Sequence, residues 1–68
     1  MEMRPVASSN VTAVGYDAAT ETLRIDFNSG TYDYSNVPED VYEGLVTAAS
    51  VGRFIAQNIR GNYPSTKV

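Results

Sequence analysis

The spacing of hydrophobic residues changes near Val37 and Pro38, and this change limits the folds that the chain can adopt. Before it, apolar residues alternate with polar ones, as they do in half-buried strands. After it, they recur every three or four residues, as on one face of a helix. Strands followed by helices predict an α+β fold. Because the chain has 68 residues, we expect a single domain over residues 1–68.

Three segments before the change are typical of strands. The clearest pattern is the one in which Leu23, Ile25 and Phe27 alternate with charged residues, so that one face is apolar. The turn Asn28–Gly30 is of hairpin length and contains a glycine, which tolerates the positive φ of tight turns. Residues 1–7 are expected to be a loose lead-in. The predicted strands, forming a three-stranded antiparallel β-meander, cover residues 10–16, 22–28 and 31–35.

Two helices are predicted after the change, packed on one face of the sheet in the order βββαα. Pro38 suits a first helical position, and the acids Glu39 and Asp40 favour the positive end of the helix dipole. Ser50 is a natural N-cap for the next helix, and Gly61 is a natural stop. The predicted helices cover residues 38–49 and 51–60. The predicted core contains Leu23, Ile25, Phe27, Val41, Leu45, Phe54, Ile55 and Ile59.

The chain contains neither cysteine nor histidine. This absence excludes disulfides, the usual structural zinc sites, and Ser-His-Asp or Cys-His catalysis. We therefore expect no metal, no cofactor and no enzymatic activity. No apolar run approaches the roughly 18 residues of a membrane span, and Met1–Pro5 does not look like a signal peptide. The expected location is cytoplasmic, without a membrane partner.

Charge is unevenly distributed along the chain. All eight acids lie within residues 1–43. The charged residues of the segment 44–68 are all cations, namely Arg53, Arg60 and Lys67. The net charge of −3 suits long nucleic acid poorly, because such binding depends on neutralising many phosphates. The negative net charge does not exclude a local anion site. The alternative is that solvated charges are simply unevenly placed.

The start of the second predicted helix is a candidate anion site. Ser50 and Gly52 offer a hydroxyl and a close backbone approach beside free helix-start N–H groups. Arg53 adds a guanidinium, and Arg60 lies two turns further along the same predicted helix face. The sequence thus predicts ligand binding by Ser50, Gly52, Arg53 and Arg60. The alternative is a capped helix with two exposed arginines.

Tyr32 and Tyr34 share one face of the third predicted strand. They could form a stacking platform for bases. The core interpretation is favoured, because a chain with no tryptophan and only two phenylalanines must draw aromatic volume from tyrosine. Ser8–Asn10 could also contact a ligand, but these residues are typical of an ordinary polar turn.

Several short motifs together resemble the KTSC domain family over residues 6–64. The matching residues are Ser8–Val11, Val14–Asp17, Tyr32–Tyr34, Val37–Pro38, Val41–Tyr42, Leu45, Ser50, Gly52, Ile59–Arg60 and Tyr63–Pro64. Ala56 stands where the family often has asparagine, and the stretch before Tyr32 is one residue shorter. The resemblance implies a compact domain of unestablished function, found free-standing and at the C-terminus of some lysyl-tRNA synthetases, for which RNA binding has been suggested.

Two functions follow as hypotheses. The first is a non-catalytic module that recognises RNA or a small nucleotide-like, phosphate-bearing anion. The second is a protein–protein interaction module that acts through its sheet face or edge, as a homo-oligomer or with a partner protein. Association is expected because so short a chain, without metal or disulfide, gains stability by burying a sheet edge.

Overall fold

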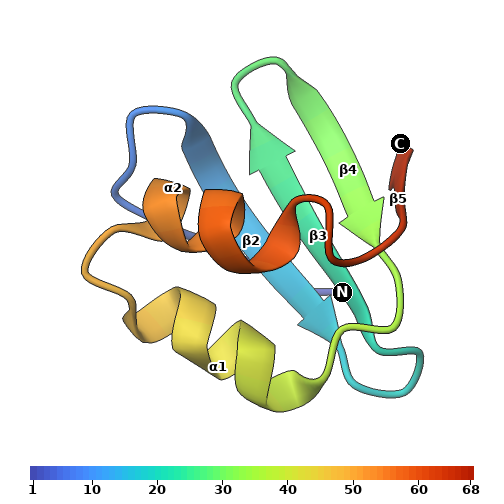
Figure 1. The fold of residues 1–68 in the computed structure, drawn as a ribbon. Coiled ribbons are helices and arrows are strands. Elements are labelled where there is room, and N and C mark those ends of the chain that lie inside the picture. The colour runs from blue at the N-terminus through green and yellow to red at the C-terminus, as the bar shows by residue number, and fades with distance from the viewer.

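A computed structural model describes residues 1–68 and shows one antiparallel sheet with helices on one of its faces (Figure 1). The strands are β1 (Met3–Pro5), β2 (Val11–Asp17), β3 (Thr22–Phe27), β4 (Gly30–Tyr34) and β5 (Ser65–Lys67). The helices are α1 (Glu39–Thr47), α2 (Val51–Phe54) and the π-helix η1 (Ile55–Ile59). This arrangement confirms the α+β class. No helix is long and apolar enough to cross a membrane.

The predicted meander forms the centre of the sheet as β2, β3 and β4. In β3, Leu23 and Ile25 are buried under the helices, as the alternating pattern predicts. Arg24 lies opposite Asp33 of β4 in the strand register and donates two hydrogen bonds to its carboxylate, of 2.7 and 2.9 Å. This ion pair lies on the face of the sheet away from the helices.

The sheet has five strands, so the prediction of three was wrong. The first unpredicted strand, β1, lies in the supposed lead-in and pairs with β2; the second, β5, follows the helices and pairs with β4. Neither carries an alternating apolar pattern, and every residue of β5 is exposed. Both strands are held by backbone pairing to an existing edge, which apolar spacing does not report.

The helical region begins as predicted but follows a different path. Pro38 is extended and immediately precedes α1, which ends at Thr47 because Ala48 is already extended. Ser50 caps α2 by accepting a hydrogen bond of 3.3 Å from the Arg53 N–H. The α-helix then gives way to η1, whose last turn closes with the Arg60 N–H donating to the Ile55 carbonyl at 2.8 Å. The predicted helix over 51–60 is therefore present over residues 51–59, but its second half is a π-helix.

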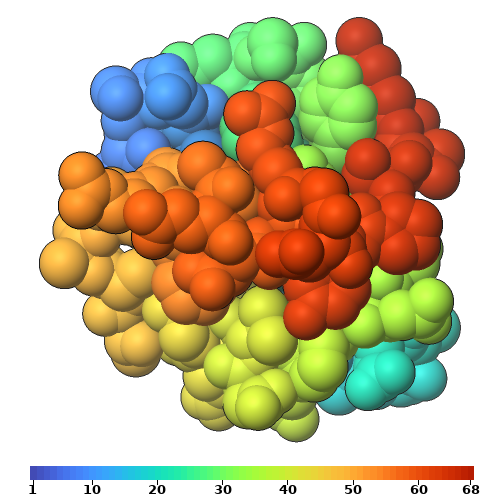
Figure 2. Space-filling view, viewed as in Figure 1, coloured from blue at the N-terminus to red at the C-terminus, as the bar shows by residue number.

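The core lies between the sheet and the helices. The buried residues are Val11, Val14, Leu23, Ile25, Tyr34, Val37, Leu45, Val51, Ile55 and Ile59. Three predicted core residues, Phe27, Val41 and Phe54, are only partly buried and pack against it. Phe27 and Phe54 stay partly exposed because each borders a surface hollow. The segment after residue 50 spreads over the sheet and leaves the β3–β4 hairpin accessible along one side (Figure 2).

Candidate anion-binding site

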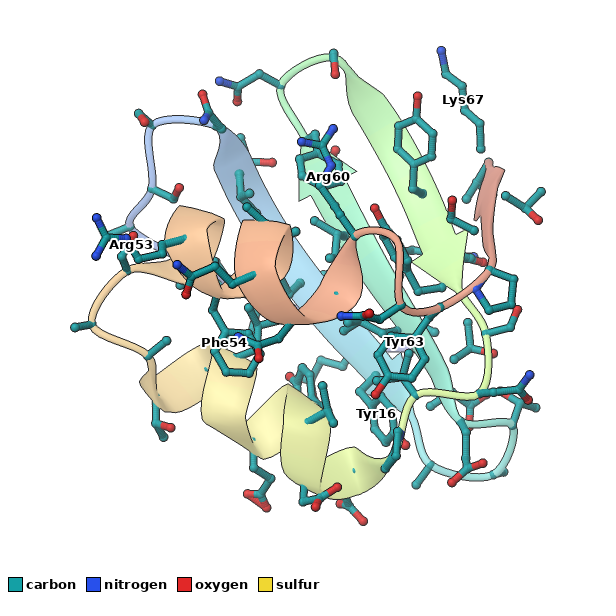
Figure 3. All side chains as sticks on the ribbon, viewed as in Figure 1. Tyr16, Arg53, Phe54, Arg60, Tyr63 and Lys67 are labelled. Carbon is teal, nitrogen blue, oxygen red and sulfur yellow. The ribbon has the colours of Figure 1, made fainter.

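Arg60 projects from the end of η1 toward the β3–β4 hairpin (Figure 3). Its backbone is extended, which carries the side chain out over the sheet. The guanidinium carbon lies 5.8 Å from the centre of the Phe27 ring, within the range of a cation–π contact. The one ion pair of the molecule joins Arg24 to Asp33. The positive charge of Arg60 therefore has no carboxylate partner.

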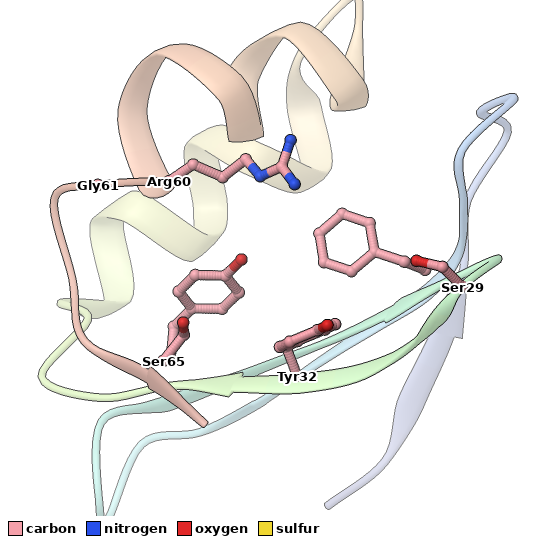
Figure 4. Close-up of a pocket in the computed structure, with 7 residues that line it drawn as sticks. Ser29, Tyr32, Arg60, Gly61 and Ser65 are labelled. Carbon is pink, nitrogen blue, oxygen red and sulfur yellow. The ribbon is translucent and has the colours of Figure 1, made fainter. Parts of the chain in front are cut away.

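Below Arg60 lies a hollow of about 270 Å³, which we call the aromatic hollow (Figure 4). It is lined by Phe27, Ser29, Tyr32, Tyr34, Arg60, Gly61 and Ser65. Phe27 and Tyr32 meet edge to face, with ring centres 5.9 Å apart and an interplanar angle of 76°. The lining combines three aromatic rings, two serine hydroxyls and one guanidinium, without any acid. Such a surface suits a planar ligand that carries negative charge.

The two tyrosines of β4 differ in their surroundings. Tyr34 is only 5% exposed, as the core interpretation predicts, and burial raises the pKa of its phenol above 10.0 although the Arg60 guanidinium opposes the rise. Its hydroxyl is therefore protonated at neutral pH and can donate a hydrogen bond into the aromatic hollow. Tyr32 is half-buried, so one part of its ring remains accessible from the hollow.

Lys67 adds a second positive charge beside the aromatic hollow. It is the cross-strand partner of Tyr32, and residues directly opposite each other share one face of a sheet. A Cβ atom placed on Gly30 would lie 3.1 Å from Lys67 Cε and 4.0 Å from Tyr32 Cε1, so both side chains lie close to this glycine. Tyr32 thus lines the aromatic hollow together with Arg60 and has Lys67 as its cross-strand neighbour.

A second hollow, of about 290 Å³, lies on the other side of Arg60, and we call it the polar hollow. It is lined by Asn10, Val11, Phe27, Asn28, Ser29, Gly52, Ile55 and Arg60. Asn28 holds this region together, because its side chain donates to the Ser9 carbonyl at 2.7 Å and its backbone N–H to the Asn10 carbonyl at 3.0 Å. The two hollows share Phe27, Ser29 and Arg60. We call them together the Arg60 cleft.

The structure divides the anion site predicted from the sequence. Gly52 and Arg60 line the polar hollow, whereas Ser50 and Arg53 line a separate hollow at the corner between α1 and α2, and the two arginines lie well apart in Figure 3. In a continuous α-helix, residues seven apart share a face. The i→i+5 turn of η1 takes up an extra residue and rotates Arg60 away from Arg53 by roughly 100°. Arg53 and Arg60 therefore do not line one cavity, as the sequence had suggested.

Sequence reasoning did not identify Phe27, Ser29 and Ser65 as site residues. Phe27 was assigned to the core, and Ser29 was treated only as part of a turn. Ser65 reaches the cleft because β5 pairs with β4, and no sequence signal predicted that pairing. The positive charge of the segment after Gly44 was the one signal that pointed to this side of the molecule.

Comparison with family models gives a match to the KTSC domain over residues 7–63. A protein of Tsukamurella paurometabola is 46% identical over 54 residues, covering 78% of this chain and 81% of that protein. A lysine–tRNA ligase of a Nostoc species is 38% identical over 56 residues, which cover 81% of this chain but only 10% of the ligase.

A solved structure supports the same grouping. The crystal structure of a KTSC domain protein from Yersinia pestis superposes with a TM-score of 0.97 and 37% sequence identity. The match covers 98% of this chain and 96% of the other, so both edge strands and the helical segment lie within the shared fold.

Proposed function

The chain belongs to the KTSC domain family, and from that premise we propose that it is a non-catalytic module that binds a small, phosphate-bearing, nucleotide-like anion in the Arg60 cleft. The observation that carries the proposal is the position of the Arg60 guanidinium. It has no carboxylate partner, it lies against an aromatic ring, and it borders both hollows.

The chemistry of the cleft matches the parts of a nucleotide. A guanidinium can donate two parallel hydrogen bonds to a phosphate, and Lys67 adds a second cation nearby. A base can stack on the accessible part of Tyr32, since every base offers a π-face and such stacking contributes about 1–3 kcal/mol. Ser29, Ser65 and the Tyr34 hydroxyl provide hydrogen-bonding groups around that ring.

Two further considerations favour a short ligand. The net charge of −3 opposes binding to long nucleic acids, which depends on many phosphate contacts. Relatives named lysine–tRNA ligases contain a segment similar to this chain, which agrees with a nucleotide-like ligand. The ligases' activity is not assigned to this chain, because the matching segment is only about a tenth of each ligase.

The test is titration of the ¹⁵N-labelled protein with adenosine 5′-monophosphate (AMP), followed by amide chemical shifts. We expect the largest shifts in the β3–β4 hairpin and from Arg60 to Lys67. Arg60→Gln should lower the affinity about tenfold or more, because a hydrogen bond to a charged group contributes about 1.5–3 kcal/mol. Arg53→Gln is the matched control, since it removes the same charge from a residue outside the cleft.

Three results would contradict the proposal. Equal losses in the two variants would show that only net charge matters. Shifts centred on Ser50 and Arg53 would return the site to the start of α2. The absence of any response at millimolar AMP and low salt would favour the alternative function, in which the open face or an edge of the sheet binds a protein partner.

A further inference from the structure

The Arg60 cleft has two compartments, and its cation lies between them rather than at one end. The aromatic and polar hollows meet at Phe27, Ser29 and Arg60. Each hollow, at about 270 and 290 Å³, is slightly smaller than the roughly 300–1,000 Å³ typical of small-molecule sites. Joined through their shared wall, they reach that range. A ligand that fills both must therefore pass the guanidinium at its middle.

We propose that the ligand is a dinucleotide whose internal phosphodiester lies at Arg60, with one nucleoside in the aromatic hollow and the other in the polar hollow. This inference rests on the proposed function and specifies where the ligand carries its charge. A ligand with a terminal phosphate, such as a mononucleotide, places its charge at Arg60 and leaves one hollow filled with water.

The polar hollow has free hydrogen-bonding capacity for a second nucleoside. The Asn10 side-chain amide makes no hydrogen bond within the protein. The Asn28 side chain makes a hydrogen bond only through Nδ2, so its amide oxygen is free. An amide both donates and accepts hydrogen bonds, which matches the edges of bases and the hydroxyls of ribose. Ser29 adds a hydroxyl at the boundary between the two hollows.

Gly52 keeps the polar hollow open. A Cβ atom at this position would meet only the Ser8 hydroxyl, at 3.7 Å, which is an ordinary contact. Glycine stabilises a helix less than almost any other residue, and packing within the protein does not require a glycine at this position. The space it leaves borders the hollow, and a ligand entering the hollow would use it.

The test compares AMP with the dinucleotide ApA, which contains one internal phosphodiester, by calorimetry on the full chain. We expect ApA to bind at least tenfold more tightly than AMP. Gly52→Leu places a side chain in the polar hollow and should lower the affinity for ApA far more than the affinity for AMP. Asn10→Ala, which changes the same hollow without adding volume, should also weaken ApA more than AMP. Tyr32→Ala should weaken both ligands.

The outcomes separate the two proposals. If AMP binds through Arg60 but ApA binds no more tightly, or if neither Gly52→Leu nor Asn10→Ala affects ApA, the two-compartment ligand is wrong and the anion site stands. If neither ligand binds, both proposals fail. Thermal unfolding of Gly52→Leu and Asn10→Ala shows whether each variant is folded before its affinity is interpreted.

Discussion

Gly44 and Gly52 both lie in helices, yet a side chain at each position would meet different surroundings. A Cβ atom on Gly44 would lie 3.1 Å from Phe54 Cζ and 3.2 Å from Phe54 Cε2, whereas one on Gly52 would meet only Ser8. Gly44 therefore sets how closely α1 approaches α2, and a larger residue there must displace the Phe54 ring.

We expect Gly44→Leu to lower the free energy of unfolding by about 1–3 kcal/mol, as overpacking commonly does. The same substitution at Gly52 should be neutral or stabilising by up to about 1 kcal/mol, because leucine favours helix more than glycine. Urea unfolding of both variants measures the difference. Equal effects would show that the contact between Gly44 and Phe54 does not limit helix packing.

The Arg24–Asp33 pair predicts a pH dependence of stability. Its hydrogen bonds hold the pKa of the Asp33 carboxyl below its ordinary value of 3.8. A pKa that is lower in the folded state contributes stability above the ordinary value, and this contribution is lost as the pH falls through the folded-state pKa. We therefore expect the stability difference between wild type and Asp33→Asn to shrink as the pH falls from about 5 to about 2.

Urea unfolding across that pH range measures this difference, and carboxyls common to both proteins cancel in the comparison. In an Arg24→Gln background, where the partner is absent, Asp33→Asn should produce little pH-dependent change. A difference that stays constant with pH in the wild-type background would show that the ion pair does not perturb Asp33.

At the scale of single residues, sequence patterns predicted burial best where one face was clearly apolar. Leu23 and Ile25 are buried as the alternation of β3 predicts. Tyr32 and Tyr34 share the same face of β4 but differ in exposure. Their difference depends on where the segment after η1 crosses the sheet, which the period of a single strand does not specify.

Among the elements, η1 determines the direction of Arg60. Removing one residue from this π-turn would restore the α-helical i→i+4 pattern without turning Arg60, because Arg53 and Arg60 would then be six residues apart and roughly 120° apart around the helix, as the π-turn already leaves them. Deletion of Gln57 is suitable, because this residue is exposed and makes no hydrogen bond through its side chain. Ile55 and Ile59 would then be three residues apart and would still share one helix face.

We expect the Gln57 deletion to fold and to bind AMP about as tightly as the wild type, because the Arg60 N–H can still donate to the Ile55 carbonyl and Arg60 keeps its direction. Circular dichroism and calorimetry measure these effects, and Gln57→Ala is the control for the side chain alone. Binding as weak as that of Arg60→Gln by the folded deletion variant would show that Arg60 needs the extra residue of the π-turn to reach the cleft.

Some elements of this fold could be predicted from the sequence, and others could not. Both helices and the three central strands were located because each buries an apolar stripe. The strands β1 and β5 bury almost nothing and form because β2 and β4 offer unpaired backbone groups. The π-turn gave no signal either, since the apolar spacing of its residues fits an α-helix equally well.

For the molecule as a whole, charge asymmetry pointed to the C-terminal segment but did not indicate which cavity its cations line. Arg60 lines the aromatic hollow, and Lys67 is the cross-strand partner of Tyr32, which lines the same hollow. Arg53 does not join them. Locating the cleft required three features of tertiary structure at once: the π-turn, the edge strand β5 and the partly exposed Phe27 ring. None of the three is specified by local sequence.

The order of strands in the sheet follows the order of the chain, and this has a consequence for how the molecule opens. Each neighbouring pair of strands is joined by a short connection except β4 and β5, between which the whole helical segment intervenes. Closing a longer loop costs more conformational entropy, and β5 is short, polar and exposed. The strand β5 should therefore detach more often than any central strand.

Amide hydrogen exchange would detect this hierarchy, with fast exchange at Val68, whose N–H donates to the Thr31 carbonyl at 2.8 Å, and slow exchange in β3. Because Ser65 lines the aromatic hollow and Lys67 lies beside it, each detachment would also dismantle one wall of the Arg60 cleft. Saturating AMP should then slow exchange in β5 far more than in β3. Ligand binding and the final folding step of the C-terminal strand would be one coupled equilibrium.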